Sequence, residues 1–201
     1  MSVPILILAG GSSSRMGSRQ KLLEPVHGQP LLRVQACRAL KASPHVTVLI
    51  RPDVPLVKQA LNGLDVRILE APQAHEGMSG SIRAGAHAHV NDPCFLMLLT
   101  DLIDIDTTDM RKVINARDAQ TDHWIWRGAT EDGKPGHPIL FDQKVYDALL
   151  GIRGDTGAQE VIKANKNKVQ LVPLPGRRAR RDLDTPQDWD DWHAQNPTQS
   201  P

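Results

Sequence analysis

Short apolar runs alternate along the chain with stretches whose apolar residues recur at helical spacing. Continuous runs rich in Val, Ile and Leu predict buried strands, and the stretches between them predict helices. We expect strands at residues 3–9, 46–50, 66–69, 94–99 and 122–127. We expect helices at 30–40, 54–61, 79–88 and 107–118, the last capped by Thr107 or Thr108. The alternation is finished by segments 139–141, 144–150, 158–164 and 169–173, and by a helix that begins at Pro186 and carries Trp189 and Trp192.

This order of elements predicts an α/β protein with a three-layer, Rossmann-like architecture. Its sheet should be mostly parallel, with helices on both faces. We expect one domain over residues 1–194 and a disordered tail at 195–201. The turn residues of 131–136 indicate a hairpin or a small insertion. Ligands of such sheets bind beyond the carboxyl ends of the strands, where the strand order reverses.

Composition narrows the possible functions. The 201 residues include 24 Lys and Arg against 23 Asp and Glu, a balance that argues against a dedicated nucleic-acid or membrane-surface binder. No apolar run approaches the length of a membrane span. The first nine residues lack the features of a signal peptide, and Cys37 and Cys94 form no disulfide framework. We therefore expect a cytoplasmic protein.

The most informative segment is the loop that follows the first apolar run. Glycines and serines at 10–17 end in Arg15 and are followed by Lys21. Consecutive backbone N–H groups in such a loop form an anion-binding concavity, and the two cations suit a polyphosphate. The spacing matches neither the Walker loop nor the dinucleotide fingerprint. The residues that we expect to bind a nucleotide here are Leu8, Ala9, Gly10, Gly11, Ser12, Ser13, Ser14, Arg15, Met16, Gly17 and Lys21.

The motif Leu-Ala-Gly-Gly-x-x-x-Arg-Met-Gly-x-x-x-Lys over residues 8–21 resembles the opening of nucleotidyltransferases, above all the MobA/MocA-type molybdenum cofactor nucleotidyltransferases. The resemblance implies the nucleotide-diphospho-sugar transferase fold and a Mg²⁺-dependent reaction with a nucleoside triphosphate. It covers residues 3 to about 192. It also implies that a second small-residue segment lines the nucleotide pocket, through Gly77, Met78, Ser79 and Ser81, of which the two serines can also cap a helix.

Carboxylates at two places point to a metal site. Asp101 ends the strand at 94–99, where a hard cation such as Mg²⁺ is readily bound. Relatives have Gly-Asp-Met-Pro there, whereas this chain has Thr100-Asp-Leu-Ile103, which puts the loop geometry in question. The segment Asp182-Leu-Asp184-Thr-Pro186 resembles the family's closing Asp-x-Asp-Thr-Pro, with Asp184 as a metal ligand and Asp182 as a supporting one. We interpret Asp104 and Asp106 as solvated or capping residues.

The remaining motifs concern the second substrate. Gly136-His137-Pro138 resembles the Gly-His-Pro of the cytidylyltransferase branch and should face the acceptor, whereas Gly10 stands where the guanylyltransferases have glycine. CTP is favoured, and GTP stays open. The basic run 177–181 could bind an anionic acceptor, although a solvated run is favoured.

The resemblance therefore implies a transferase that moves a nucleoside monophosphate from CTP to the phosphate of the molybdenum cofactor. Arg15, Lys21 and Asp101 are the expected catalytic residues, and a molybdenum hydroxylase is a possible protein partner. A guanylyltransferase, a transferase for another phosphate or sugar-phosphate acceptor, and a non-catalytic chaperone that binds the cofactor for a molybdoenzyme are the alternatives.

Overall fold

The computed structural model describes residues 2–11, 14–17, 19–117, 121–154 and 157–196. Its strands are β1 (Ile5–Ala9), β2 (Pro25–Val26), β3 (Gln29–Pro30), β4 (Val46–Ile50), β5 (Arg67–Glu70), β6 (Cys94–Leu99), β7 (Ile125–Ala129), β8 (Pro135–Asp142) and β9 (Val169–Pro173). Its α-helices are α1 (Leu31–Ala42), α2 (Pro55–Gln59), α3 (Met78–Ala88), α4 (Thr107–Asn115), α5 (Tyr146–Gly151), α6 (Gln159–Ala164) and α7 (Pro186–Gln195).

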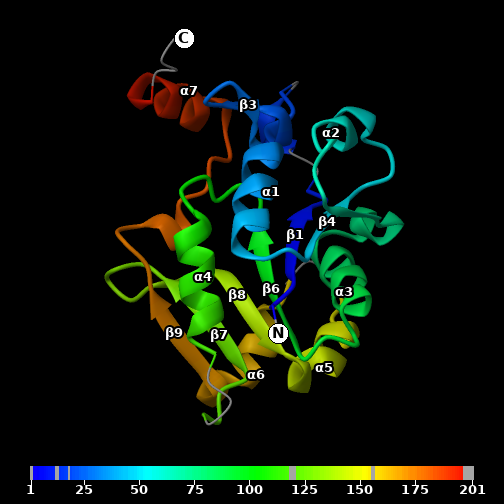
Figure 1. The fold of residues 1–201 in the computed structure, drawn as a ribbon, viewed down its shortest axis with the longest axis vertical. Helices are drawn as coiled ribbons and strands as arrows, with labels where there is room; N and C mark the ends of the chain where they lie inside the picture. The colour runs from blue at the N-terminus through cyan, green and yellow to red at the C-terminus, as the bar shows by residue number, and fades with distance from the viewer. Residues whose placement is uncertain (1, 12–13, 18, 118–120, 155–156, 197–201) are drawn as a thin grey trace.

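Seven strands form one sheet in the order β5-β4-β1-β6-β8-β7-β9. β5, β4, β1 and β6 run parallel, β8 is antiparallel to both of its neighbours, and β7 pairs with β9 in parallel. The prediction of a mostly parallel sheet is confirmed, and the expected hairpin joins β7 to β8. After β1 the chain adds β4 and β5 on one side of β1, and it then adds β6 on the other side. The strand order therefore reverses between β1 and β6 (Figure 1).

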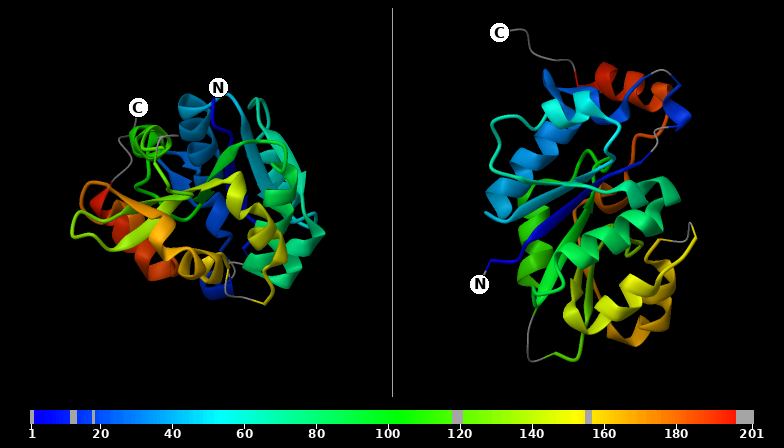
Figure 2. Two further views of the ribbon diagram at one scale, coloured as in Figure 1. Left: turned by 90° about the horizontal axis from the view of Figure 1, so that it is seen from below. Right: turned by 90° about the vertical axis from the view of Figure 1, so that its right-hand side faces the viewer.

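Helices cover both faces of the sheet, as the alternation predicted (Figure 2). On one face of the sheet, buried residues of α1 and α4 pack against side chains of β1, β4 and β6. Buried residues of α3, α5 and α6 pack against the other face. A smaller cluster joins Trp189 and Trp192 of α7 to Met16 and Leu31, so α7 lies at the end of the molecule where the carboxyl ends of β1 and β6 meet (Figure 1).

The structure corrects several expected helix ends. α4 is capped by Asp106, whose side chain accepts from the backbone of Thr108 and Asp109, and not by Thr107 or Thr108. An aspartate at this position can form the reciprocal capping box with Asp109, which satisfies more backbone groups than a threonine inside the helix. α4 ends at Asn115 rather than at residue 118.

Two further boundaries differ from the predictions. α3 begins at Met78 after Gly77, whose φ is +91°, so neither Ser79 nor Ser81 caps it. α7 extends through Gln195, one residue into the segment predicted as a tail, and residues 197–201 lie outside the described part of the chain.

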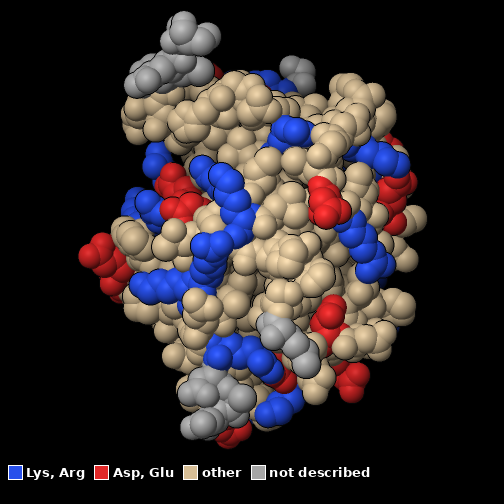
Figure 3. Space-filling view, in the orientation of Figure 1, with Lys and Arg blue, Asp and Glu red and all other residues tan. Residues whose placement is uncertain are grey.

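Lys and Arg side chains gather on the face that α1 and α4 form (Figure 3). Several of them donate to backbone carbonyls of neighbouring elements: Arg33 to Ala60 and Asn62, Arg111 to Lys41, and Lys112 to Pro173. These side chains therefore link α1 and α4 to each other and to neighbouring segments of the chain. Over the described residues, no helix is long and apolar enough to cross a membrane.

Candidate active site

The site lies where the carboxyl ends of β1 and β6 meet. Thr100, the residue after β6, donates its hydroxyl to Leu8 O of β1 at 2.8 Å, which holds the two strand ends in register. The loop after β1 and Asp101 after β6 therefore leave the sheet side by side, at the reversal in strand order where α/β proteins bind ligands.

A cavity of about 460 Å³ opens at this edge. The predicted residues that line it are Leu8, Ala9, Gly10, Gly11, Arg15, Lys21, Gly77, Met78, Ser81, Asp101 and Asp184. Leu22, Arg51, Ala74, His75, Leu99 and Thr100 complete the lining. Arg51 and His75 were not predicted, although Arg51 follows the strand at 46–50 directly and the rule of carboxyl ends could have indicated it.

Other predicted residues lie outside this lining. Met16 is buried against the tryptophans of α7, and Ser79 is buried within α3, where its hydroxyl lies 3.5 Å from Arg153 O. Gly17 has a φ of +62°, which suits a turn rather than a pocket wall. Ser12 and Ser13 lie outside the described residues, and Ser14 begins a short 3₁₀ helix over Ser14–Met16.

Lys21, Asp101 and Asp184 form the polar centre of the cavity. The Lys21 ammonium, whose side chain is 9% exposed, donates to Asp101 Oδ2 at 2.9 Å and to Asp184 Oδ1 at 2.5 Å. Arg15 Nη1 lies 2.5 Å from the other oxygen of Asp184. Two cations thus balance two carboxylates, and a phosphate that entered would compete with the carboxylates for the same ammonium and guanidinium groups.

Local structure holds Asp184 at the cavity. It precedes Thr185, which caps α7 in a reciprocal box with Asp188. The Asp184 N–H also donates to Asp188 Oδ2 at 3.1 Å. Because α7 is anchored by buried Trp189 and Trp192, packing of that helix fixes the carboxylate. Asp182, by contrast, lines another hollow, beside Arg181 and Trp192, so the structure does not bring it to Asp101.

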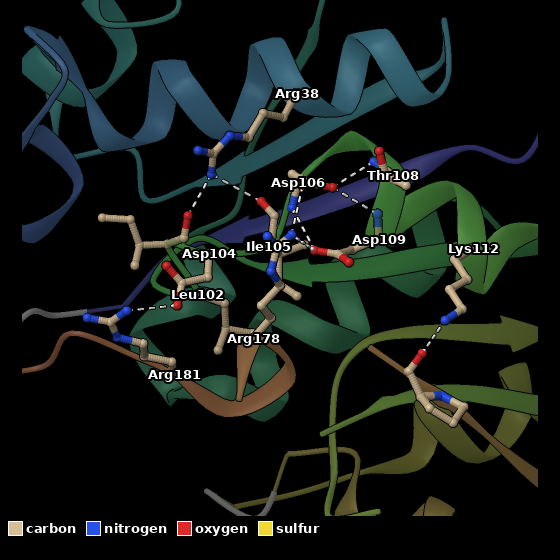
Figure 4. A network of polar contacts seen from close by, with 12 residues as sticks. Arg38, Leu102, Asp104, Ile105, Asp106, Thr108, Asp109, Lys112, Arg178 and Arg181 are labelled. Atoms are coloured by element: carbon tan, nitrogen blue, oxygen red, sulfur yellow. Dashed lines mark hydrogen bonds and ion pairs between the residues drawn. The ribbon is translucent and has the colours of Figure 1, made fainter. Parts of the chain in front are cut away.

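The loop after Asp101, whose geometry the sequence left in question, is held by side chains of α1. Gln35 donates to Leu102 O at 2.8 Å. Arg38 donates to Ile103 O at 2.6 Å and to Ile105 O at 3.1 Å (Figure 4). Burial lowers the pKa of Arg38, and the carbonyls satisfy a guanidinium that is otherwise costly to enclose.

Arginines of the basic run 177–181 tie the C-terminal segment to the same loop. Arg178 pairs with Asp106 at 2.8 Å and with Asp109 at 3.1 Å, and Arg181 pairs with Asp104 at 3.2 Å (Figure 4). Burial raises the pKa of Asp109, whereas backbone and Arg178 hydrogen bonds outweigh burial and lower that of Asp106. Arg177 and Arg180 are exposed, as predicted for a solvated run, whereas the partly exposed Arg178 and Arg181 form ion pairs. These pairs join the chain segments that carry Asp101 and Asp184.

Gly10 lies in a tight part of the cavity. A Cβ added there would meet Ser81 Oγ at 2.9 Å and Ala74 Cβ at 3.0 Å. The pocket wall formed by the start of α3 and the short helix Pro72–Glu76 therefore packs directly against the glycine-rich loop. Glycine at position 10 follows from this packing, whichever base is bound.

The segment Gly136-His137-Pro138 belongs to β8 and is not part of the cavity lining in the described residues. A Cβ on Gly136 would lie 2.0 Å from Ala179 O, so this glycine lets the 3₁₀ helix Arg178–Arg180 pack on β8. Burial and the charge of Arg127 lower the pKa of His137 to about 3, so its ring is neutral near pH 7. That this segment faces the acceptor stays a prediction.

The residues present fit a divalent cation. Asp101 Oδ1 is buried and has no hydrogen-bond partner in the described structure, as expected of an oxygen available to a metal. No group of three or more His, Cys, Asp or Glu side chains in the described part of the chain could hold a metal. A cation at Asp101 and Asp184 would therefore need phosphate and water oxygens as further ligands, which is the usual arrangement for Mg²⁺ in nucleotide enzymes.

The sheet order, the glycine-rich loop after β1 and the carboxylate after β6 define the nucleotide-diphospho-sugar transferase fold. Residues 5–169 match the model of the MobA-like NTP transferase domain. The chain belongs to that family, a family of nucleotidyltransferases.

Individual relatives agree on the fold. The Mycobacterium tuberculosis protein Rv0371c is 22% identical, with a TM-score of 0.81 over 96% of this chain and 97% of that one, and it has also been solved in complex with manganese. A CMP:2-keto-3-deoxy-manno-octonic acid synthetase complexed with CTP is 15% identical, with a TM-score of 0.77 over 98% of each chain. A curated relative, the nicotine blue oxidoreductase of Paenarthrobacter nicotinovorans, is 25% identical over 90% of this chain and 91% of its own.

Proposed function

We propose that this chain is a Mg²⁺-dependent cytidylyltransferase that transfers CMP from CTP to the phosphate of molybdopterin or the molybdenum cofactor and releases pyrophosphate. The observation that carries the proposal is the cluster at the β1–β6 edge. Lys21 there is shared by Asp101 and Asp184, next to a glycine-rich loop. Membership of the MobA-like family supports the reaction class, and the choice of CTP and of the acceptor rests on the Gly-His-Pro and Asp-x-Asp-Thr-Pro motifs.

An oxygen of the acceptor phosphate attacks the α-phosphorus of CTP, and the bond from that phosphorus to the bridging oxygen breaks. A phosphate nucleophile is already ionised at neutral pH, so the reaction needs positioning and charge neutralisation more than a base. Lys21 and Arg15 bind the β- and γ-phosphates and stabilise the charge on the departing pyrophosphate. Asp101 and Asp184 would hold Mg²⁺, which supplies further charge neutralisation at the phosphates.

The test is pyrophosphate release from CTP, GTP, ATP and UTP, each with Mg²⁺ and molybdenum cofactor, by the native chain and by Asp101→Asn. We expect release with CTP, and a loss of at least 100-fold in kcat for the variant, because the substitution removes one of two metal-binding carboxylates while keeping the side-chain volume. Selectivity for GTP would assign the chain to the guanylyl branch. Unchanged turnover in Asp101→Asn would overturn the metal assignment.

Two outcomes would favour other functions. Binding of nucleotide and cofactor without pyrophosphate release would support a chaperone for a molybdoenzyme. The name of the Paenarthrobacter relative describes a redox reaction of that protein, so a parallel assay with a reduced nicotinamide as hydride donor is informative. The charged cavity described above supports phosphate chemistry instead, and we expect no hydride transfer.

A further inference from the structure

Arg127 of β7 is a buried cation without a matching acid. The residue is 8% exposed, and its Nε donates to Gly136 O at 2.8 Å. Among the residues that the structure describes, no carboxylate oxygen lies within 4.0 Å of its guanidinium, and neither Nη has a hydrogen-bond acceptor. Buried charges in proteins are normally paired, so this guanidinium has donors available for an anion from solution.

A second arginine lies near Arg127, and the described groups next to it include no negative charge to balance the two. Burial lowers the pKa of Arg127, and the nearby charge of Arg180 lowers it further. The neighbouring His137 ring is neutral near pH 7, and its Nδ1 is buried without a partner. Arg180 lies against the same strand, because a Cβ on Gly136 would meet Arg180 Cγ at 2.9 Å. An anion bound here would therefore be attracted by two guanidinium groups.

The strand register places Arg127 on the same side of the sheet as the cavity. Met97 of β6 and Arg127 of β7 both pair with Ile139 of β8, so the three residues form one row across the sheet. Met97 and Ile139 belong to the core on the α3 face, where Ser81 and Met78 of α3 line the cavity. Strands are about 4.8 Å apart, so Arg127 lies roughly 10 Å from β6.

This position is the one that the reaction geometry requires of the acceptor. In phosphoryl and nucleotidyl transfer, the attacking and leaving oxygens lie in line on opposite sides of the phosphorus. The glycine-rich loop, where pyrophosphate leaves, follows β1, and Asp101 follows β6. The nucleophile must therefore approach from the other side of β6, which is where β8 and β7 lie.

We propose that Arg127, with Arg180 beside it, binds a phosphate group of the acceptor substrate at the β8–β7 part of the sheet edge. The planar guanidinium presents paired N–H donors that match a phosphate. The inference rests on the proposed function for the identity of the acceptor, but the anion site itself can be tested without it.

The first test uses phenyl phosphate as the probe and the imidazole resonances of His137 as the reporter, assigned with a His137→Gln variant. We expect a saturable shift of the His137 signals in the native chain, at least tenfold weaker binding in Arg127→Met, and retained binding in Arg127→Lys at intermediate affinity. Arg67→Met, which changes β5 at the opposite end of the sheet, should leave the His137 titration unchanged. Phenyl phosphate that moves only the Gly10 and Gly11 amide signals would overturn the proposal.

The second test separates a binding role from a structural one. Arg127→Met removes a buried charge that has no carboxylate partner but also removes the Nε hydrogen bond to Gly136 O, so we expect its Tm to change little. A purely structural role would lower the Tm and leave the KM for the acceptor unchanged. In the turnover assay the variant should raise the KM for molybdopterin at least tenfold and leave the KM for CTP within twofold. If the native chain fails to turn over that acceptor, the proposed function fails, and the phosphate titration still decides the anion site. An equal rise of both KM values would overturn the assignment to the acceptor.

Discussion

Lys21→Met offers a direct test of the charge arrangement at the candidate site. In the structure the ammonium is shared by Asp101 and Asp184, at 2.9 and 2.5 Å. These are the same two carboxylates that we assign to the metal. Removing the ammonium should therefore have opposite effects on metal affinity and on stability, a combination that a general loss of packing would not produce.

The magnitudes follow from the distances. A divalent cation held by these carboxylates lies within roughly 4 Å of Nζ, where a charge of +2 and a charge of +1 repel by about 2 kcal/mol at the dielectric constant of water. Salt screening leaves about 1–2 kcal/mol, which corresponds to roughly 5- to 30-fold tighter binding of the metal by Lys21→Met. Without metal, the two carboxylates lose their shared counter-ion. Because their side chains are 30% and 23% exposed, we expect a loss of about 2 kcal/mol, or a fall in Tm of about 4–8 °C.

The assay is a titration with Mn²⁺ alone, followed by calorimetry and by thermal unfolding with and without Mn²⁺. The matched control is Lys58→Met, which removes an exposed lysine that pairs with Glu70 at 2.6 Å and should change neither quantity beyond error. Manganese should restore more stability to Lys21→Met than to the native chain. Mn²⁺ affinity that stays the same or falls in Lys21→Met would show that these carboxylates do not hold the cation, and the reasoning would be refuted.

Three further predictions concern packing, charge and pH. Gly85→Ala places a Cβ 2.2 Å from Leu6 Cδ2 and should lower the free energy of unfolding in urea by about 1–3 kcal/mol. The control Gly151→Ala lies in open space at the end of a helix and should raise it by about 0.5 kcal/mol. Equal effects of the two substitutions would contradict the packing of α3. Arg178→Met leaves the two carboxylates that it bridges without their cation. We expect the free energy of unfolding to fall by only about 1 kcal/mol, because the arginine is partly exposed, and kcat to fall at a temperature where the variant is fully folded. The pKa of His137 is lowered to about 3 in the folded chain, so between about pH 6.5 and 3 the unfolded chain binds a proton that the folded chain does not. The free energy of unfolding therefore falls as the pH falls through that window, by up to about 1.4 kcal/mol per pH unit. His137→Gln should flatten this part of the stability curve, and an unchanged slope would contradict the burial of the ring.

The alternation of apolar runs was sufficient to predict the fold class, because periodicity is a local property of the chain. β4 and β6 coincide with the predicted ranges, and the glycine-rich loop and Asp101 follow their strands as expected. A parallel sheet brings the carboxyl ends of its strands to one edge. The sequence therefore also determined that the loop after β1 and Asp101 belong to the same site.

The resemblance assigned Lys21, Asp101 and Asp184 to one site, but only the tertiary structure shows that one ammonium pairs with both carboxylates. Lys21 lies 80 residues from Asp101 and 163 from Asp184, and no local pattern predicts ion pairs over that separation. The same holds for Arg51, which lines the cavity, and for Arg127, whose strand appeared in the sequence as an apolar run and not as a binding site. Asp182 shows the limit of a local rule. It shares a motif with Asp184, yet packing of α7 turns the two residues to different hollows, because side-chain direction at a helix entrance depends on where the helix docks and not on spacing along the chain.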